Sequence, residues 1–146
     1  MGEGRVRGAW VNRISVWFIR MALIYFIIAA SMGVLMLMLP WWTRTYIPGH
    51  AHLNLLGWVS MTLYGVLYHV VPKHSGRPLY SKKLGWVHFY LANIGVWGMV
   101  LYFGFVGHGK LEYGQHLLYS AYIELISVII FVYNMMMTIK VVEEKN

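Results

Sequence analysis

Residues 21–43, MALIYFIIAASMGVLMLMLPWWT, decide the fold, because this stretch contains no charged side chain. A helix needs about 20 apolar residues to cross the hydrocarbon core of a bilayer. Three further stretches are at least as long: 45–72, 84–109 and 113–139. Glu124 is the only charged residue in them. We therefore expect an all-α integral membrane protein with four spans, near residues 16–39, 50–71, 84–106 and 114–138.

The composition agrees with a chain that is covered by lipid. Apolar residues make up 59% of the 146 residues and charged residues only 12%, whereas a typical soluble domain is roughly a quarter charged. The five acidic residues are all Glu, and so few charges could not cover the surface of a soluble protein. The absence of Cys excludes disulfides, iron–sulfur clusters and covalent attachment of a c-type haem.

The basic residues predict how the chain is oriented. Of the twelve Lys and Arg, ten fall on one side of the expected spans and two, Arg44 and Lys110, on the other. The positive-inside rule then places both termini in the cytoplasm, in the inner membrane of a prokaryote. Since the basic residues lie between spans rather than on one soluble face, the net charge of +7 does not indicate a nucleic-acid partner.

Short loops between the spans favour an up-down-up-down four-helix bundle, with residues 1–146 forming a single membrane domain. The first apolar run is too long for a secretory signal peptide. Gly57 and Gly65 lie near one face of the second span. Two interpretations of these glycines are open, because small residues let membrane helices pack closely and also leave room for a flat cofactor.

The fourth span carries a polar stripe at helical spacing, formed by His116, Ser120, Glu124, Ser127 and Asn134. Such a stripe must face protein or water rather than lipid. Glu124 lies about 12 Å below His116 by helical rise, and an unpaired carboxylate at that depth is costly, so we expect it to be neutral or paired. It either joins helices through Ser120 or Ser127, or relays protons beside a cofactor.

The seven histidines fall into two levels, which is the strongest indication of a cofactor. His52 and His116 open the second and fourth spans near the outer face, while His69 and His88 lie near the inner face. Two neutral imidazoles at one depth can hold a haem iron from both sides. We expect His52 with His116 as one axial pair, and His69 with His88 as a second site. The competing interpretation of each is an interfacial His bonded to a neighbour.

His50 is the alternative to His52. Residues two apart on a helix point in different directions, so only one of the two can face the same cofactor. His50 takes the place of His52 if the helix begins at a different residue, and otherwise it is free to bond a haem propionate.

The segment 50–58, HAHLNLLGW, followed by 64–72, YGVLYHVVP, resembles the second helix of subunit I of the haem-copper oxidase superfamily. The resemblance is greatest to the nitric oxide reductase branch, in which a His-x-Asn-Leu-Leu start leads to a Gly-x-x-Tyr-Tyr-x-Val-Pro end. The first His of that motif is an axial ligand of the low-spin haem b, and the matching position in this chain is His52. The resemblance therefore implies a non-covalent haem b. Together with the second histidine level, we expect one or two haem b groups per chain.

The whole chain also resembles a group of short four-helix proteins related to subunit I, in which a His-Phe-Trp-like segment opens the third helix. Here that segment is His88-Phe89-Tyr90. Subunit I itself has twelve or more helices, and this chain lacks the later cluster of His that forms the binuclear centre. The resemblance thus implies a redox protein that is not a complete oxidase or nitric oxide reductase on its own.

Three functions remain open. The first is a b-type haem protein that carries electrons through a bis-His haem, with a quinol or a redox partner subunit. The second is a haem-based binder or sensor of a gas such as NO, O2 or CO. The third is a non-haem accessory subunit, or a metal or proton transporter. Because four helices form a thin wall around a haem, we expect a homodimer or a larger membrane complex.

Overall fold

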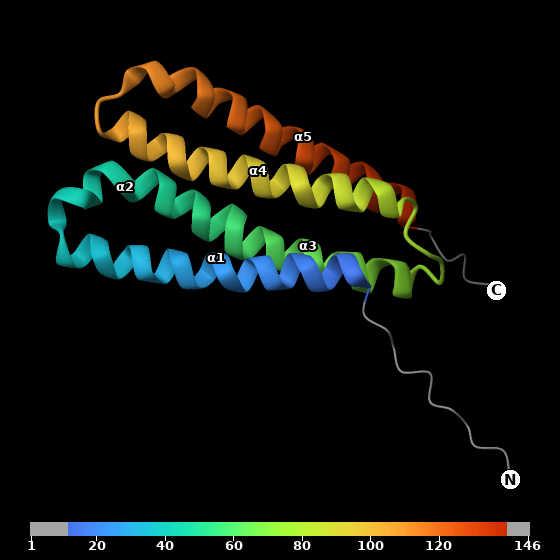
Figure 1. The fold of residues 1–146 in the computed structure, drawn as a ribbon. Helices are drawn as coiled ribbons and strands as arrows, with labels where there is room; N and C mark the ends of the chain where they lie inside the picture. The colour runs from blue at the N-terminus through green and yellow to red at the C-terminus, as the bar shows by residue number, and fades with distance from the viewer. Residues whose placement is uncertain (1–11, 140–146) are drawn as a thin grey trace, which may run out of the picture.

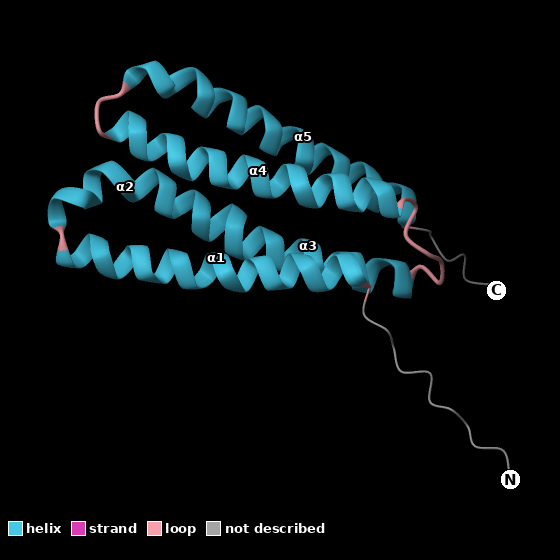
Figure 2. Ribbon diagram, viewed as in Figure 1, coloured by secondary structure: helices cyan, strands magenta, loops and turns pink. Residues whose placement is uncertain are grey.

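The computed structural model describes residues 12–139, whose regular structure is helical throughout (Figure 2). The elements are α1 (Arg13–Met38), α2 (Pro40–His52), the π-helix η1 (Leu53–Ser60), α3 (Met61–His74), α4 (Lys82–Gly107), the 3-10 helix η2 (Leu111–Tyr113) and α5 (Gly114–Thr138). Because α2, η1 and α3 follow one another directly, they form one long helix. Four helical rods in this part of the chain are long and apolar enough to cross a membrane, and consecutive rods run antiparallel (Figure 1). The expected all-α membrane bundle is therefore confirmed.

The second rod begins well before residue 50, where the sequence predicted its start. Only Leu39 separates it from α1, and Pro40 occupies its first turn. Proline suits that position, because its fixed φ is already helical and its missing N–H would have had no partner there. The expected outer loop is thus itself helical. The starts of α1 and α4 follow ordinary capping, since Asn12 accepts from the Ile14 amide and Ser81 from the Leu84 amide.

Gly57 and Gly65 hold α1 against the second rod. A Cβ at Gly57, in the widened turns of η1, would lie 2.9 Å from Cγ of Tyr25. A Cβ at Gly65 would lie 2.7 Å from Cγ1 of Ile19 and 3.0 Å from the carbonyl oxygen of Ser15. Both glycines are buried in this contact. Of the two interpretations, close helix packing is the one that the structure shows, because α1 fills the space that a flat cofactor would need.

The two ends of the bundle differ in how completely they are closed. At the end of the α3–α4 loop, side chains from all four rods meet around His88. At the other end α2 packs against α1 and α4, whereas α5 packs against α4, α3 and η2 and has no contact with α2. At this end of the bundle α4 therefore lies against both α2 and α5, which do not pack against each other.

The polar stripe of the fourth span faces protein, as a membrane environment requires. Its buried members are Ser120, Glu124, Ser127, Asn134 and, further along, Thr138. Ser120 and Glu124 lie in the tight contact between α5 and α4, where Gly98 and Gly95 lack the side chains that would keep the helices apart. Asn134 and Thr138 bond instead to Ser81 and Tyr80, just before α4. His116, the first residue of the expected stripe, is instead exposed.

Candidate functional site

A hydrogen bond to the backbone fixes the ring of His52. Its Nδ1 lies 2.8 Å from the carbonyl oxygen of Pro48. Because a carbonyl can only accept, Nδ1 carries the proton, and the lone pair of the neutral ring is on Nε2. A hydrogen bond of this kind from the second ring nitrogen is the usual support of a metal-bound His. The half-buried ring rests on Phe103 of α4, 4.9 Å away between centroids, and no described residue bonds Nε2.

His50 is placed differently, although it is only two residues away. Its ring packs against α1, where a Cβ at Gly33 would lie 3.3 Å from His50 Cε1. The side-chain amide of Asn54 lies 3.3 Å from Nε2 and also donates to the His50 carbonyl oxygen at 2.9 Å. The other ring nitrogen, Nδ1, is buried without a partner among the described residues. His52 rather than His50 therefore presents an accessible nitrogen.

His116, the expected partner of His52, lies on the outside of the bundle. Its exposed ring is 5.3 Å from the ring of Tyr102 and 5.7 Å from that of Tyr113. It borders a hollow of about 410 Å³ between α4 and α5, whose walls include Trp97 and Gly98. Since α5 does not contact α2, the structure does not bring His52 and His116 together within one chain.

The inner pair is not assembled either. His88 is fully buried, with its Nδ1 3.0 Å from the hydroxyl of Tyr68. The rings of Phe18, Tyr64 and Phe131 lie 4.6–5.2 Å from its own. His69 is not among these ring neighbours; it lines a separate groove of about 350 Å³ beside the α3–α4 loop. Aromatic rings thus occupy the volume around His88, and the pair His69 and His88 does not fit a haem iron.

Glu124 is buried in the middle of the bundle. It is 5% exposed, and its Oε2 has no hydrogen-bond partner among the described residues. Ser120 donates to the His116 carbonyl oxygen at 2.8 Å rather than to the carboxyl group. The carboxyl group therefore belongs to a buried polar layer, and its role as a proton relay stays a prediction.

Several contacts that hold the site's scaffold were not identified from the sequence. Tyr25 donates to Asn93 Oδ1 at 2.8 Å and joins α1 to α4. Arg77, in the α3–α4 loop, donates to the last carbonyl groups of α5, those of Met137, Thr138 and Ile139. Tyr64 and Tyr68 are four residues apart and therefore lie on one helix face. This spacing could have predicted that both rings pack beside His88. Between residues 12 and 139, no three His, Asp or Glu side chains gather as a metal ion would require.

Comparisons with known proteins identify the family of the chain. The family model described as cytochrome C and quinol oxidase polypeptide I matches residues 4–142. A cbb3-type cytochrome c oxidase subunit, CcoN1 of Stutzerimonas stutzeri, is 52% identical over 48 residues, which are 32% of this chain and 10% of that protein. Cytochrome c oxidase subunit 1 of Rhodobacter capsulatus is 49% identical over 49 residues, 33% of this chain and 9% of that protein.

A similarity to a haem-copper oxidase subunit I+III of Aeropyrum pernix extends further along the chain. The two proteins are 37% identical over 94 residues, which are 62% of this chain and 11% of that protein. The chain thus spans about a tenth of the length of the curated relatives it matches. Because the family model covers nearly the whole sequence, this multi-pass membrane protein belongs to the cytochrome c and quinol oxidase polypeptide I family.

Proposed function

We propose that this chain is a membrane-embedded b-type haem protein that carries electrons, with His52 as an axial ligand of the haem iron. One observation carries the proposal: Nδ1 of His52 is held by the Pro48 carbonyl group, which leaves Nε2 unbonded and accessible. A haem, when bound, supplies one-electron redox chemistry. The His52 ring is already fixed in one tautomer and supported by Phe103, so this residue needs little rearrangement to ligate iron.

A second chain completes this haem site. The interior of the bundle is packed, and the hollow beside His116 is formed by α4 and α5 rather than by α2. A haem on His52 would lie at the end of the bundle where α2 and α5 do not pack against each other, so that one chain covers it incompletely. We assign the second axial position to His116 of another copy, or to a ligand of a redox partner subunit. Electrons enter from a quinol or from that partner.

A gas-binding haem is the second candidate, and one observation favours it. No other His ring of the described residues lies beside His52, so a haem held by one chain would have an open axial position. Such a site binds carbon monoxide, whereas a bis-His haem does not. The geometry of residues 12–139 offers no comparable support for a non-haem transporter or accessory subunit.

Visible spectroscopy of the purified full-length protein separates these functions. We expect sharp reduced bands of a six-coordinate haem b that carbon monoxide changes little. Conversion of most of the haem to a carbon monoxide complex would instead support the gas-binding function, and a colourless protein would contradict both haem proposals.

We also propose that both termini lie in the cytoplasm, because ten of the twelve basic residues lie on that side. Reporter fusions check this orientation. A phosphatase that is active only outside the cytoplasm should be active when fused at Lys110, in the α4–α5 loop, and inactive when fused after Asn146. Activity at both positions, or only after Asn146, would overturn the assignment.

A further inference from the structure

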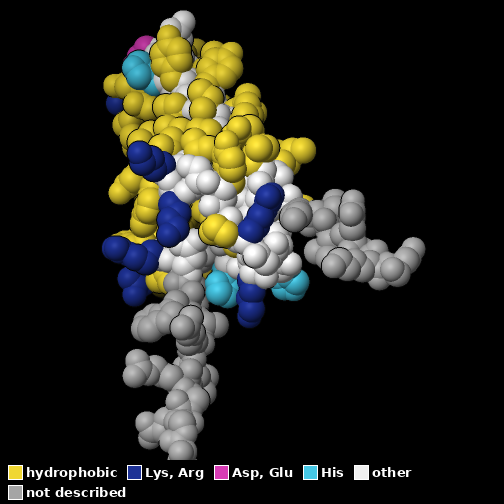
Figure 3. Space-filling model, turned by 90° about the vertical axis from the view of Figure 1, so that its right-hand side faces the viewer, with side chains coloured by type: hydrophobic (Ala, Val, Ile, Leu, Met, Phe, Trp, Pro, Cys, Tyr) yellow, Lys and Arg dark blue, Asp and Glu magenta, His cyan; other side chains and the backbone are white. Residues whose placement is uncertain are grey.

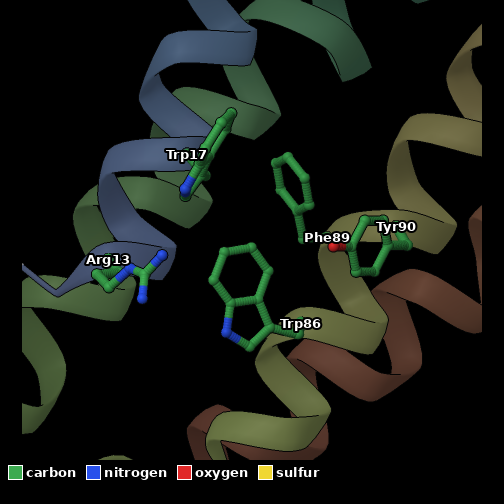
Figure 4. A pocket seen from close by; sticks show the side chains of 5 residues that line it. All are labelled: Arg13, Trp17, Trp86, Phe89 and Tyr90. Atoms are coloured by element: carbon green, nitrogen blue, oxygen red, sulfur yellow. The ribbon is translucent and has the colours of Figure 1, made fainter.

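We propose that an anionic phospholipid binds between α1 and α4 at the basic end of the bundle. Its phosphate group would lie on Arg13 and one acyl chain in the slot lined by Trp17, Trp86, Phe89 and Tyr90. This slot encloses about 560 Å³. Figure 4 shows Arg13 and Trp17, from α1, facing Trp86 and Phe89, from α4, across the opening.

The charge at this end of the molecule attracts an anion. Figure 3 shows Lys and Arg side chains gathered around the end where α3 and α4 are joined. The two acidic residues of the described part, Glu112 and Glu124, lie in η2 and in the interior of the bundle. Arg13 therefore has no carboxylate partner there, and it is exposed. Helices α1 and α4 both begin at this end, so their positive helix dipoles add to the attraction.

A second cation, Arg20, lies against Trp17, one of the walls of the slot. Arg20 lies seven residues after Arg13, which places it on the same helix face about 10 Å further along. Its guanidinium group lies 5.6 Å from the centroid of the Trp17 ring. An Arg within a span is costly unless its long side chain reaches a polar group at the interface. A phosphate held between Arg13 and Arg20 satisfies both guanidinium groups.

The walls of the slot favour a lipid over free phosphate. Trp86 and Phe89 meet edge to face at 5.7 Å, and Trp17 meets Phe89 in the same way at 6.4 Å. These rings offer apolar surface to an acyl chain and place two indole N–H groups near the headgroup level. Inorganic phosphate gains nothing from the aromatic walls. A basic pocket between membrane helices is the kind of site that binds anionic lipid headgroups.

Lipid titration followed by native mass spectrometry tests the proposal. The full-length protein in detergent is titrated with phosphatidylglycerol or with phosphatidylcholine, and the bound fraction is measured. Arg13→Gln should weaken phosphatidylglycerol binding about tenfold or more, because a charge-assisted hydrogen bond is lost. The matched control is Lys83→Gln, which removes the same charge at the same end from an exposed residue outside the slot, and it should change binding less than twofold. Both variants change exposed residues, and equal thermal unfolding checks that they fold.

Three results would overturn the lipid site. The first is equal affinity of the parent protein for phosphatidylglycerol and phosphatidylcholine. The second is an equal loss in Arg13→Gln and Lys83→Gln, which would reduce the effect to general surface charge. The third is complete displacement of phosphatidylglycerol by millimolar inorganic phosphate, which would show an anion site without a role for the acyl slot. Persistence of the lipid in phosphate buffer, with selective loss in Arg13→Gln, would support it.

Discussion

A chain in which His52 is replaced by Ala is expected to lose the haem that we propose the parent protein binds. The Nε2 atom of His52 is the accessible nitrogen of a ring whose Nδ1 is already bonded, 2.8 Å from the Pro48 carbonyl oxygen. Removing the His52 imidazole would leave one axial position of the iron without a ligand. We expect less than about a tenth of the parent's haem content. Mutation of a residue that only supports a metal ligand typically costs about 10–100-fold in affinity, and loss of the ligand itself should cost at least as much. Haem content after detergent purification measures the effect.

Two other His variants make this test specific. His74→Ala is the matched control, because His74 also bonds a carbonyl oxygen four residues earlier through Nδ1, at 3.0 Å, but lies at the opposite end of the bundle. It should keep the parent's haem content. His50→Ala should keep most of the haem as well, since Asn54 and α1 already hold that ring. Full haem loading of His52→Ala, or loss only in His50→Ala, would show that His52 is not the ligand.

Replacing Gly95 by Ala is expected to separate α4 from α5 and to destabilise the bundle. The added Cβ would lie 2.6 Å from Oε2, 2.9 Å from Cβ and 3.0 Å from Cα of Glu124. Part of that contact is with the backbone, which cannot turn away as a flexible side chain can. Overpacking of this kind costs about 1–3 kcal/mol. Unfolding in mixed detergent micelles should report the loss as a lower transition midpoint.

Gly114→Ala provides the comparison for Gly95→Ala. Gly114 begins α5, and a Cβ there meets no atom within 4 Å. Its stability should be unchanged or higher by up to about 1 kcal/mol, because Ala restricts the unfolded chain. Adding Glu124→Ala to Gly95→Ala removes the Glu124 carboxyl group from the collision and should recover part of the loss. A Gly95→Ala variant as stable as the parent would contradict the close α4–α5 contact.

The sequence predicted the spans well, because an uncharged run of about 20 residues in a chain this apolar is long enough to cross a bilayer as a helix. It also predicted correctly that Ser120, Glu124, Ser127 and Asn134 of the polar stripe are buried, but it was wrong about His116, which is exposed. It misplaced the start of the second rod, since residues 40–49 contain Pro and Gly, which are typical of loops as well as of first helical turns. Pro40 could belong either to a loop or to the first turn of a helix. The structure shows the second, because Leu39 alone connects α1 to the second rod.

The candidate site was less predictable than the fold. Sorting histidines by depth compares their levels along the membrane normal, but it does not say which helices are lateral neighbours. His52 and His116 share a level, but the helices that carry them, α2 and α5, do not contact each other. The sequence left His88 as either a ligand or a core residue, and the four aromatic rings around it make it a core residue. The sequence also left open whether Gly57 and Gly65 serve helix packing or make room for a cofactor. Tyr25 and Ile19 of α1 lie against them, which shows helix packing.

The most direct test of haem binding is the haem content of the pure full-length chain, determined as the pyridine haemochrome after expression with an ample supply of haem. If His52 of one copy and His116 of another share each iron, the assay should give haem b that organic solvent extracts, at one group per chain. Protein that is folded, membrane-inserted and free of haem under these conditions would contradict the proposed function.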